Sequence, residues 1–252
     1  MLTAISGSII AATVFFGAFV SGIFGMVGGQ ILLAVLLYFL SVPAAMTLFS
    51  AMMFVNGLWR ALLWRQHIHW PVTLRYLVGS IAGYGLMLLI LFVPSKPVVY
   101  LGLGLMPLIG DILPKRWAPD ITRKGMAYVG GFFIMVLQIA FGGAGNVLDM
   151  FFQASPLSRH VIVATKAMTQ LFSQAMRFVY FGALLDSVMD VVPWWFFIGL
   201  MVISAAGTSA GGGVLNRISD SHFRKGTRYL IWALSLIYVS RGLWLLFNGS
   251  TT

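Results

Sequence analysis

The sequence predicts an all-α integral membrane protein made of two inverted repeats, each with one glycine-interrupted element, re-entrant or hairpin, and three transmembrane helices. Three observations predict this fold class. The 252 residues are 60% hydrophobic and only 9% charged, whereas soluble domains carry about 25% charged residues. Long apolar runs leave no room for a separate soluble domain. The apolar pattern also restarts half-way along the chain, so any function lies inside the membrane.

The first element is the run 2–40, which has no charge and is about twice the ~20 residues that one membrane-crossing helix needs. It is interrupted by Gly25, Gly28 and Gly29, and Gln30 is its first amide side chain. A chain break at membrane depth is tolerated only where protein or a water-filled cavity satisfies the freed backbone groups. We therefore expect the break to face inward, as one half of a binding site.

The other half of that site is expected in the element 126–153, which is too short for two full spans of ~20 residues and therefore favours a re-entrant pair of short helices. Its break contains Gly142, Gly143 and Gly145, followed by Asn146. Plainer apolar segments complete each half, at 44–64, 72–92 and 98–109, and then at 161–181, 194–214 and 229–247. The expected units are a first repeat 1–110, a cytoplasmic basic linker 111–125 and a second repeat 126–252.

One ungapped offset relates the two halves. A shift of 117 positions, the separation of Arg60 and Arg177, also aligns Gly25 with Gly142 and Gly28 with Gly145. A shared offset indicates an internal repeat of the kind found in secondary transporters. If each interrupted element enters and leaves by one face, almost all loop Lys and Arg lie on one side, which the positive-inside rule makes cytoplasmic. Both termini are then periplasmic or extracellular. The net charge of +10 is explained by Lys and Arg in cytoplasmic loops rather than by nucleic-acid binding.

Polar side chains follow one face of the segment 161–181. Their spacing of i, i+4, i+7, i+8 and i+11 places them in a stripe, and they are Lys166, Gln170, Ser173, Gln174 and Arg177. Charges at membrane depth cost about 2.5–3.5 kcal/mol on insertion scales, so their presence needs a reason. The alternative to a binding role is that Lys166 and Arg177 lie close to the helix ends and snorkel to the interface. The stripe has two cations and no acid, which suits a small anion.

Backbone N–H groups at the two breaks would add hydrogen bonds to an anion, since the N-terminus of a half-helix favours negative charge. Gln30 and Asn146 lie beside the breaks, and Asn56 is a further cavity-lining candidate. Arg60, one turn after Asn56, is interpreted as a topogenic charge. Asp149 has two interpretations, an ion pair with Lys166 or Arg177 and a proton carrier coupled to substrate movement.

Two other functional classes have some support. Gly207-Thr208-Ser209-Ala210-Gly211 matches the G-x-S-x-G pattern of serine hydrolases, but that pattern requires a strand–turn–helix context; close helix packing is the preferred interpretation of these small residues. A non-transporting membrane scaffold is the second alternative. Cysteine is absent, and His67 and His69 lack a third ligand nearby, so no metal and no cofactor are expected.

The chain resembles the TauE/SafE sulfite-exporter family of small bacterial permeases. The resemblance rests on the glycine-rich break after the first apolar stretch, its repetition near the middle, and the glycine-rich third segment of each half. It implies a permease for sulfite or an organosulfonate in the bacterial inner membrane, not an enzyme. The expected partners are a small anionic substrate and the lipid bilayer, with no nucleic acid, and a homo-oligomer is compatible with the sequence. The expected mechanism is alternating access at a midplane site.

Overall fold

A computed structural model describes residues 4–24, 27–112, 119–153, 155–184, 193–215 and 220–248. These residues are helical, with short turns and no strand among them. The first half contains α1 (Ala4–Phe24), α2 (Val27–Phe39), α3 (Val42–Leu63), the short 3-10 helix η1 (Arg65–His67), α4 (Trp70–Ile90) and α5 (Lys96–Ile112). The second half contains α6 (Met126–Phe141), α7 (Gly145–Gln153), α8 (Arg159–Gly182), α10 (Trp194–Leu215) and α11 (Asp220–Phe247). The all-α prediction is confirmed for the described residues.

The first interrupted element is a pair of helices that run antiparallel in close contact. A Cβ atom placed on Gly28 of α2 would lie 1.9 Å from the carbonyl oxygen of Gly17 in α1 and 2.3 Å from the backbone nitrogen of Ser21. Only glycine permits that approach, because any side chain would displace the neighbouring backbone. Gly25, which the sequence analysis placed in this break, lies outside the described residues.

The second interrupted element consists of α6 and α7, which are separated by a non-helical break at Gly142, Gly143 and Ala144. Gly142 has a φ of 81°, and its N–H donates to the carbonyl of Gln138, which ends α6. A left-handed residue at this position is a common helix C-cap, and glycine adopts it at no steric cost. The chain can therefore restart as α7 without continuing the axis of α6.

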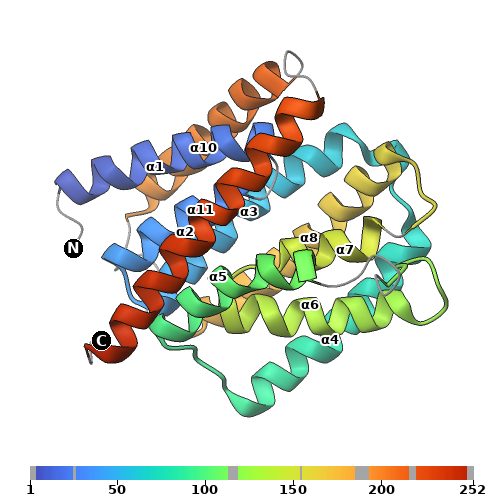
Figure 1. The fold of residues 1–252 in the computed structure, drawn as a ribbon, viewed down its shortest axis with the longest axis horizontal. Coiled ribbons are helices and arrows are strands. Elements are labelled where there is room, and N and C mark those ends of the chain that lie inside the picture. Colours follow the sequence, from blue (N-terminus) through green and yellow to red (C-terminus); the bar gives the residue numbers. More distant parts are fainter. Residues whose placement is uncertain are drawn as a thin grey trace.

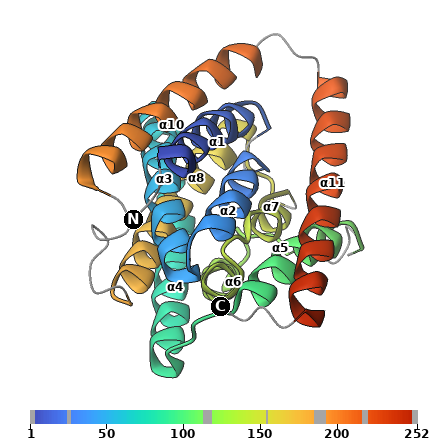
Figure 2. The same cartoon turned by 90° about the vertical axis from the view of Figure 1, so that its left-hand side faces the viewer.

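The helices pack in pairs around a central contact between α3 and α8. On one side α1 lies along α10, and on the other α4 lies along α6; α5 and α11 form a fourth pair (Figures 1 and 2). α3 also contacts α10, and α8 contacts α4. The start of α1 and the end of α11 lie at one end of the molecule, on the left of Figure 1.

Four helices among the described residues are long and apolar enough to cross a membrane, within Val42–Leu62, Trp70–Ile90, Trp194–Gly211 and Tyr229–Phe247. Shorter apolar stretches lie in α1, α2 and α6. Large apolar side chains point outward from α4 and α11, including Leu89, Leu236 and Phe247, as expected where lipid rather than water surrounds a helix. The chain is thus a multi-pass helical membrane protein.

Candidate functional site

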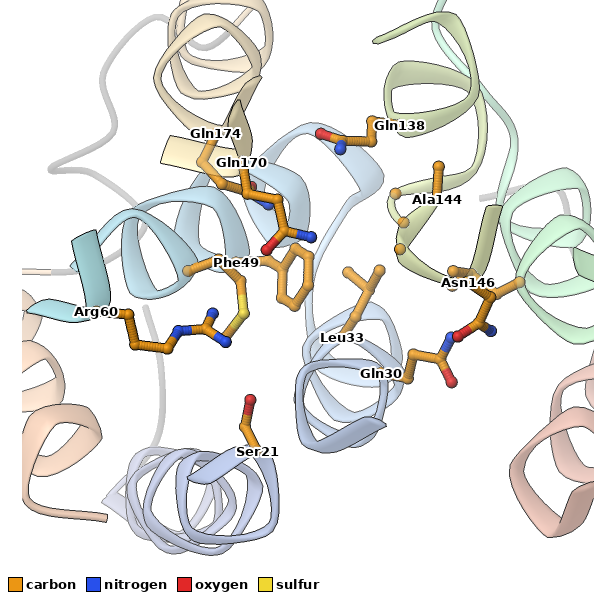
Figure 3. A pocket seen from close by; sticks show the side chains of 15 residues that line it. Ser21, Gln30, Leu33, Phe49, Arg60, Gln138, Ala144, Asn146, Gln170 and Gln174 are labelled. Carbon is orange, nitrogen blue, oxygen red and sulfur yellow. The ribbon is translucent and has the colours of Figure 1, made fainter. Parts of the chain in front are cut away.

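A pocket lies where the second break meets α2, α3 and α8 (Figure 3). Its polar lining is rich in carboxamides, and the residues that line it are Ser21, Gln30, Leu33, Phe49, Met53, Arg60, Leu103, Gln138, Gly142, Gly143, Ala144, Gly145, Asn146, Gln170 and Gln174. The pocket volume is about 40 Å³, on a scale where one water needs roughly 10–15 Å³. That space suits a few waters or one small oxyanion.

The polar stripe of α8 faces the protein interior along its length. Gln170 and Gln174 line the pocket, and both are at least nine-tenths buried. Lys166 lies one turn toward the start of α8, and Arg177 lies one turn toward its end. The stripe thus crosses the pocket, with a cation at either side of it.

Arg177 is 0% exposed and connects three parts of the structure. Its Nε donates to Ser50 Oγ of α3 at 2.7 Å, and its Nη2 donates to Gln174 Oε1 at 2.6 Å. Its Nη1 donates to the carbonyl oxygen of Gly142, at the end of α6. The guanidinium also lies over the Phe49 ring, 4.8 Å from the ring centroid. Arg177 therefore fixes the break against α3 and α8 and orients the Gln174 carboxamide.

Arg60 is in a different situation, because its side chain points toward the middle of the pocket (Figure 3). Its Nε lies 3.4 Å from the carbonyl oxygen of Asn56, one turn earlier in α3. Arg60 is the one charged residue in the pocket lining, and no carboxylate lines the described pocket beside it. A guanidinium offers up to five N–H donors and suits planar recognition of oxyanions.

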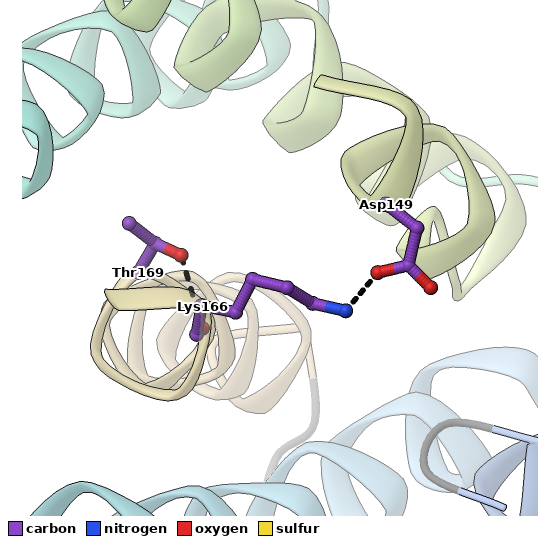
Figure 4. A network of polar contacts seen from close by, with 3 residues as sticks. All are labelled: Asp149, Lys166 and Thr169. Atoms are coloured by element: carbon purple, nitrogen blue, oxygen red, sulfur yellow. Dashed lines mark hydrogen bonds and ion pairs between the residues drawn. The ribbon is translucent and has the colours of Figure 1, made fainter. Parts of the chain in front are cut away.

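Lys166 reaches across from α8 to α7, where its ammonium group pairs with the carboxylate of Asp149 (Figure 4). The lysine and aspartate side chains are 21% and 34% exposed. Asp149 lies one turn after Asn146, and Lys166 lies one turn before Gln170, so the pair sits beside the pocket rather than in its lining. The ion pair neutralises the charge that the sequence analysis assigned to substrate binding.

The remaining residues expected at the site contact other helices. Asn56 Oδ1 accepts hydrogen bonds from Thr208 at 2.9 Å and from Ser204 at 3.3 Å, which links α3 to α10. Ser173 Oγ donates to the Thr169 carbonyl at 3.1 Å and lies 3.4 Å from the Tyr76 hydroxyl of α4. Gly28 contacts α1. Gly29 lies against the lining residues Phe49 and Met53.

The sequence profile of the sulfite exporter TauE/SafE family matches residues 9–238. That is most of the chain. The protein belongs to the TauE/SafE family. Its members are membrane transporters rather than enzymes, and the matched region includes every residue of the pocket lining. Neither the comparison with curated proteins nor the comparison with solved structures gives a match.

Seven of the site residues predicted from the sequence line the pocket of this TauE/SafE protein, namely Gln30, Gly142, Gly143, Gly145, Asn146, Gln170 and Gln174. It did not place Ser21, Gln138 or Arg60 in the pocket lining. Two signals were available: Gln138 is a lone amide in an otherwise apolar helix, and Arg60 shares the repeat offset with Arg177. Polar residues at membrane depth deserve a functional hypothesis by default.

The hydrolase motif has a structural context that differs from a nucleophile elbow. Ser209 lies within α10, and its hydroxyl donates to the Ala205 carbonyl one turn earlier at 2.9 Å. Gly207 packs against α1, where an added Cβ would lie 2.5 Å from the carbonyl oxygen of Phe15. No group of three His, Asp, Glu or Cys side chains arranged to hold a metal occurs in the described part of the chain.

Proposed function

We propose that this TauE/SafE protein is a secondary transporter for a small anion, with sulfite or an organosulfonate as substrate, and that the pocket around Arg60 is its binding site. The observation that carries the proposal is a guanidinium directed into a carboxamide-lined pocket without a carboxylate among the described lining residues. A cation left without a counter-ion in an apolar interior is costly. A bound anion would remove that cost.

In this proposal the two halves are inverted repeats. In this repeat α1 corresponds to α6 and α4 corresponds to α10. The contact of α1 with α10 therefore has the contact of α6 with α4 as its counterpart, as a two-fold axis between the repeats would require. Similar close approaches support it: Gly207 of α10 meets the carbonyl of Phe15, and Gly83 of α4 meets the carbonyl of Phe132, with added Cβ atoms 2.5 and 2.6 Å away. Phe15 and Phe132 are related by the same 117-residue offset as Arg60 and Arg177.

Alternating access is the proposed mechanism, by movement of one half against the other around the pocket. Along α8 the Lys166 end of the pocket is partly exposed, whereas at the other end Arg177 and Leu33 are 0% exposed. This difference supports a state that is accessible from the Lys166 side and closed at Arg177. Release to the other side would then require the contacts of Arg177 with Ser50 and Gly142 to open.

The proposed location is the bacterial inner membrane, with both termini periplasmic or extracellular and the basic linker 111–125 cytoplasmic. The turns around η1 and residues 119–125 lie at the right-hand end of Figure 1, opposite the start of α1 and the end of α11. Described loop cations at that end include Arg65, Arg123 and Lys124. The positive-inside rule places such an end in the cytoplasm.

The test is uptake of radiolabelled sulfite into proteoliposomes, with competition by sulfate, thiosulfate, sulfoacetate, taurine and simple carboxylates. We expect saturable uptake that one or more sulfur oxyanions inhibit and that is lost in Arg60→Gln but kept in Arg65→Gln, which changes an exposed arginine of η1. Absence of saturable uptake for every anion would instead favour a scaffold. Covalent labelling by a fluorophosphonate that disappears in Ser209→Ala would favour a hydrolase.

A further inference from the structure

Gln138 is the residue of the pocket with an unmet hydrogen-bonding requirement. Its side chain is 1% exposed, and its Oε1 has no hydrogen-bond partner among the described residues. The residue lies one turn before the break, and its backbone carbonyl accepts from Gly142 N at 2.9 Å. The carboxamide lines the pocket and extends toward α8 (Figure 3). A buried acceptor of this kind is costly unless a donor reaches it.

Several groups of the pocket lining offer hydrogen-bond donors to a ligand. Arg60 has only donors. Gln174 gives its Oε1 to Arg177, so the NH₂ group of its carboxamide remains for other acceptors. Gly145 and Asn146 lie in the first turn of α7, where backbone N–H groups have no partner within the helix. An oxyanion satisfies these donors through its oxygen atoms, but it cannot satisfy Gln138 Oε1 unless it also carries a donor.

We propose that the substrate of this pocket is an anion that retains an O–H or N–H donor, and that this donor pairs with Gln138 Oε1. The inference rests on the proposed function, because it assumes that the anion binds at Arg60. Two sources have this chemistry: a protonated inorganic oxyanion such as hydrogensulfite, and a sulfonate that carries a hydroxyl or amino group. Gln138 is then a specificity-determining residue, which distinguishes anions by whether they carry a donor.

Sulfamate and methanesulfonate provide the test, because they are singly charged anions of nearly the same shape that differ in an NH₂ or a CH₃ group. Their dissociation constants are measured by isothermal titration calorimetry on the purified full chain in detergent. We expect sulfamate to bind about tenfold more tightly, the gain of one hydrogen bond to a buried acceptor. In Gln138→Leu this preference disappears, while in Gln66→Leu, which changes an exposed glutamine of η1, it remains.

Each result has a distinct meaning. Equal affinity of the two anions in the natural protein overturns the inference, and is expected if the carboxamide presents its NH₂ group to the pocket instead. Binding of neither anion overturns the proposed function as well. The comparison in the natural protein stands even if Gln138→Leu fails to fold, and Gln138→Met is a second variant that keeps the length of the side chain.

Displacement of bound sulfamate distinguishes the two sources. Displacement by hydrogensulfite and not by 2-hydroxyethanesulfonate supports the inference and identifies the substrate as a protonated inorganic oxyanion. The reverse result supports the inference and identifies the substrate as an organic sulfonate. Sulfate has no donor at neutral pH, so displacement by sulfate as effective as that by hydrogensulfite overturns the inference.

Discussion

Arg60 of α3 and Arg177 of α8 occupy matching positions in the two halves, yet their surroundings differ. Arg177 is fully buried and gives its donors to Ser50, Gly142 and Gln174. Among the described residues Arg60 makes one long hydrogen bond, to the Asn56 carbonyl of its own helix, and its side chain points into the pocket. Arg177 connects three parts of the structure, whereas under the proposed function Arg60 binds the ligand. Residues related by one offset between the two halves can therefore differ in their contacts when their neighbours differ.

The neighbours explain the difference. At the 117-residue offset, Gln174 corresponds to Gly57 and Ser50 corresponds to Ala167. Gly57 has no side chain, and Ala167 has no hydroxyl, so neither can give Arg60 the contacts that Arg177 has. These two residues lie side by side, since an added Cβ on Gly57 would be 3.7 Å from the Ala167 carbonyl. These two differences between the halves remove the side-chain partners that Arg177 has, which agrees with the direction of the Arg60 side chain into the pocket.

The largest effect is expected for Arg177→Met. The variant leaves the Gly142 carbonyl, Gln174 Oε1 and Ser50 without their donor, and each buried group without a partner costs about 1–3 kcal/mol. We expect a loss of roughly 3–5 kcal/mol of stability, measured as a large fall in the thermal unfolding temperature in detergent. Arg75→Met, which changes an exposed arginine of α4, should leave that temperature almost unchanged. Equal behaviour of the two variants would contradict a bracing role.

Arg60→Gln is expected to affect binding rather than folding. The substitution removes the charge from the pocket lining, and hydrogen bonds to charged groups contribute about 1.5–3 kcal/mol, so the affinity for the anion should fall about 100-fold. Calorimetry with sulfamate measures this loss, and the unfolding temperature without anion should stay close to that of the natural protein. A variant that unfolds but still binds would reverse the roles of the two arginines.

Much of this arrangement was predictable from the sequence, because local signals carry it. The glycine clusters, the apolar runs and the helical spacing of Lys166, Gln170 and Gln174 all act within one helix or one break. The sequence accordingly predicted the helical segments, the second break and the buried polar stripe. It also paired Arg60 with Arg177 through a single offset.

The use of each cation was not predictable, because it depends on residues that only the tertiary structure brings together. Arg177 is 127 positions from its partner Ser50, and no periodicity within α8 indicates that contact. Gln138 is a different case, because its lone amide in the apolar helix α6 was visible in the sequence, and only its place in the pocket lining required the structure. The sequence left two interpretations of Asp149 open, and the structure pairs its carboxylate with Lys166.

A smaller effect is expected at the ion pair beside Arg60. Lys166→Met leaves the Asp149 carboxylate unpaired next to the pocket, where it repels an anion, and we expect about a tenfold loss of sulfamate affinity. The double variant Lys166→Met with Asp149→Asn should recover most of the sulfamate affinity, because the second substitution removes the repelling charge. Lys124→Met, at an exposed lysine, is the control. Failure of the double variant to recover would mean that the Lys166 ammonium itself contacts the anion.

The smallest effect tests the cause of the difference between the arginines. Ala167→Ser introduces at α8 the hydroxyl that Ser50 provides to Arg177, and we expect it to compete with the anion for the Arg60 guanidinium. One neutral hydrogen bond contributes about 0.5–1.5 kcal/mol, so the dissociation constant for sulfamate should rise about threefold. Ala164→Ser adds the same hydroxyl to another buried position of α8 and should leave the constant unchanged. If both variants bind like the natural protein, the missing hydroxyl is not what leaves Arg60 available, and the absence of a side chain at Gly57 becomes the remaining explanation.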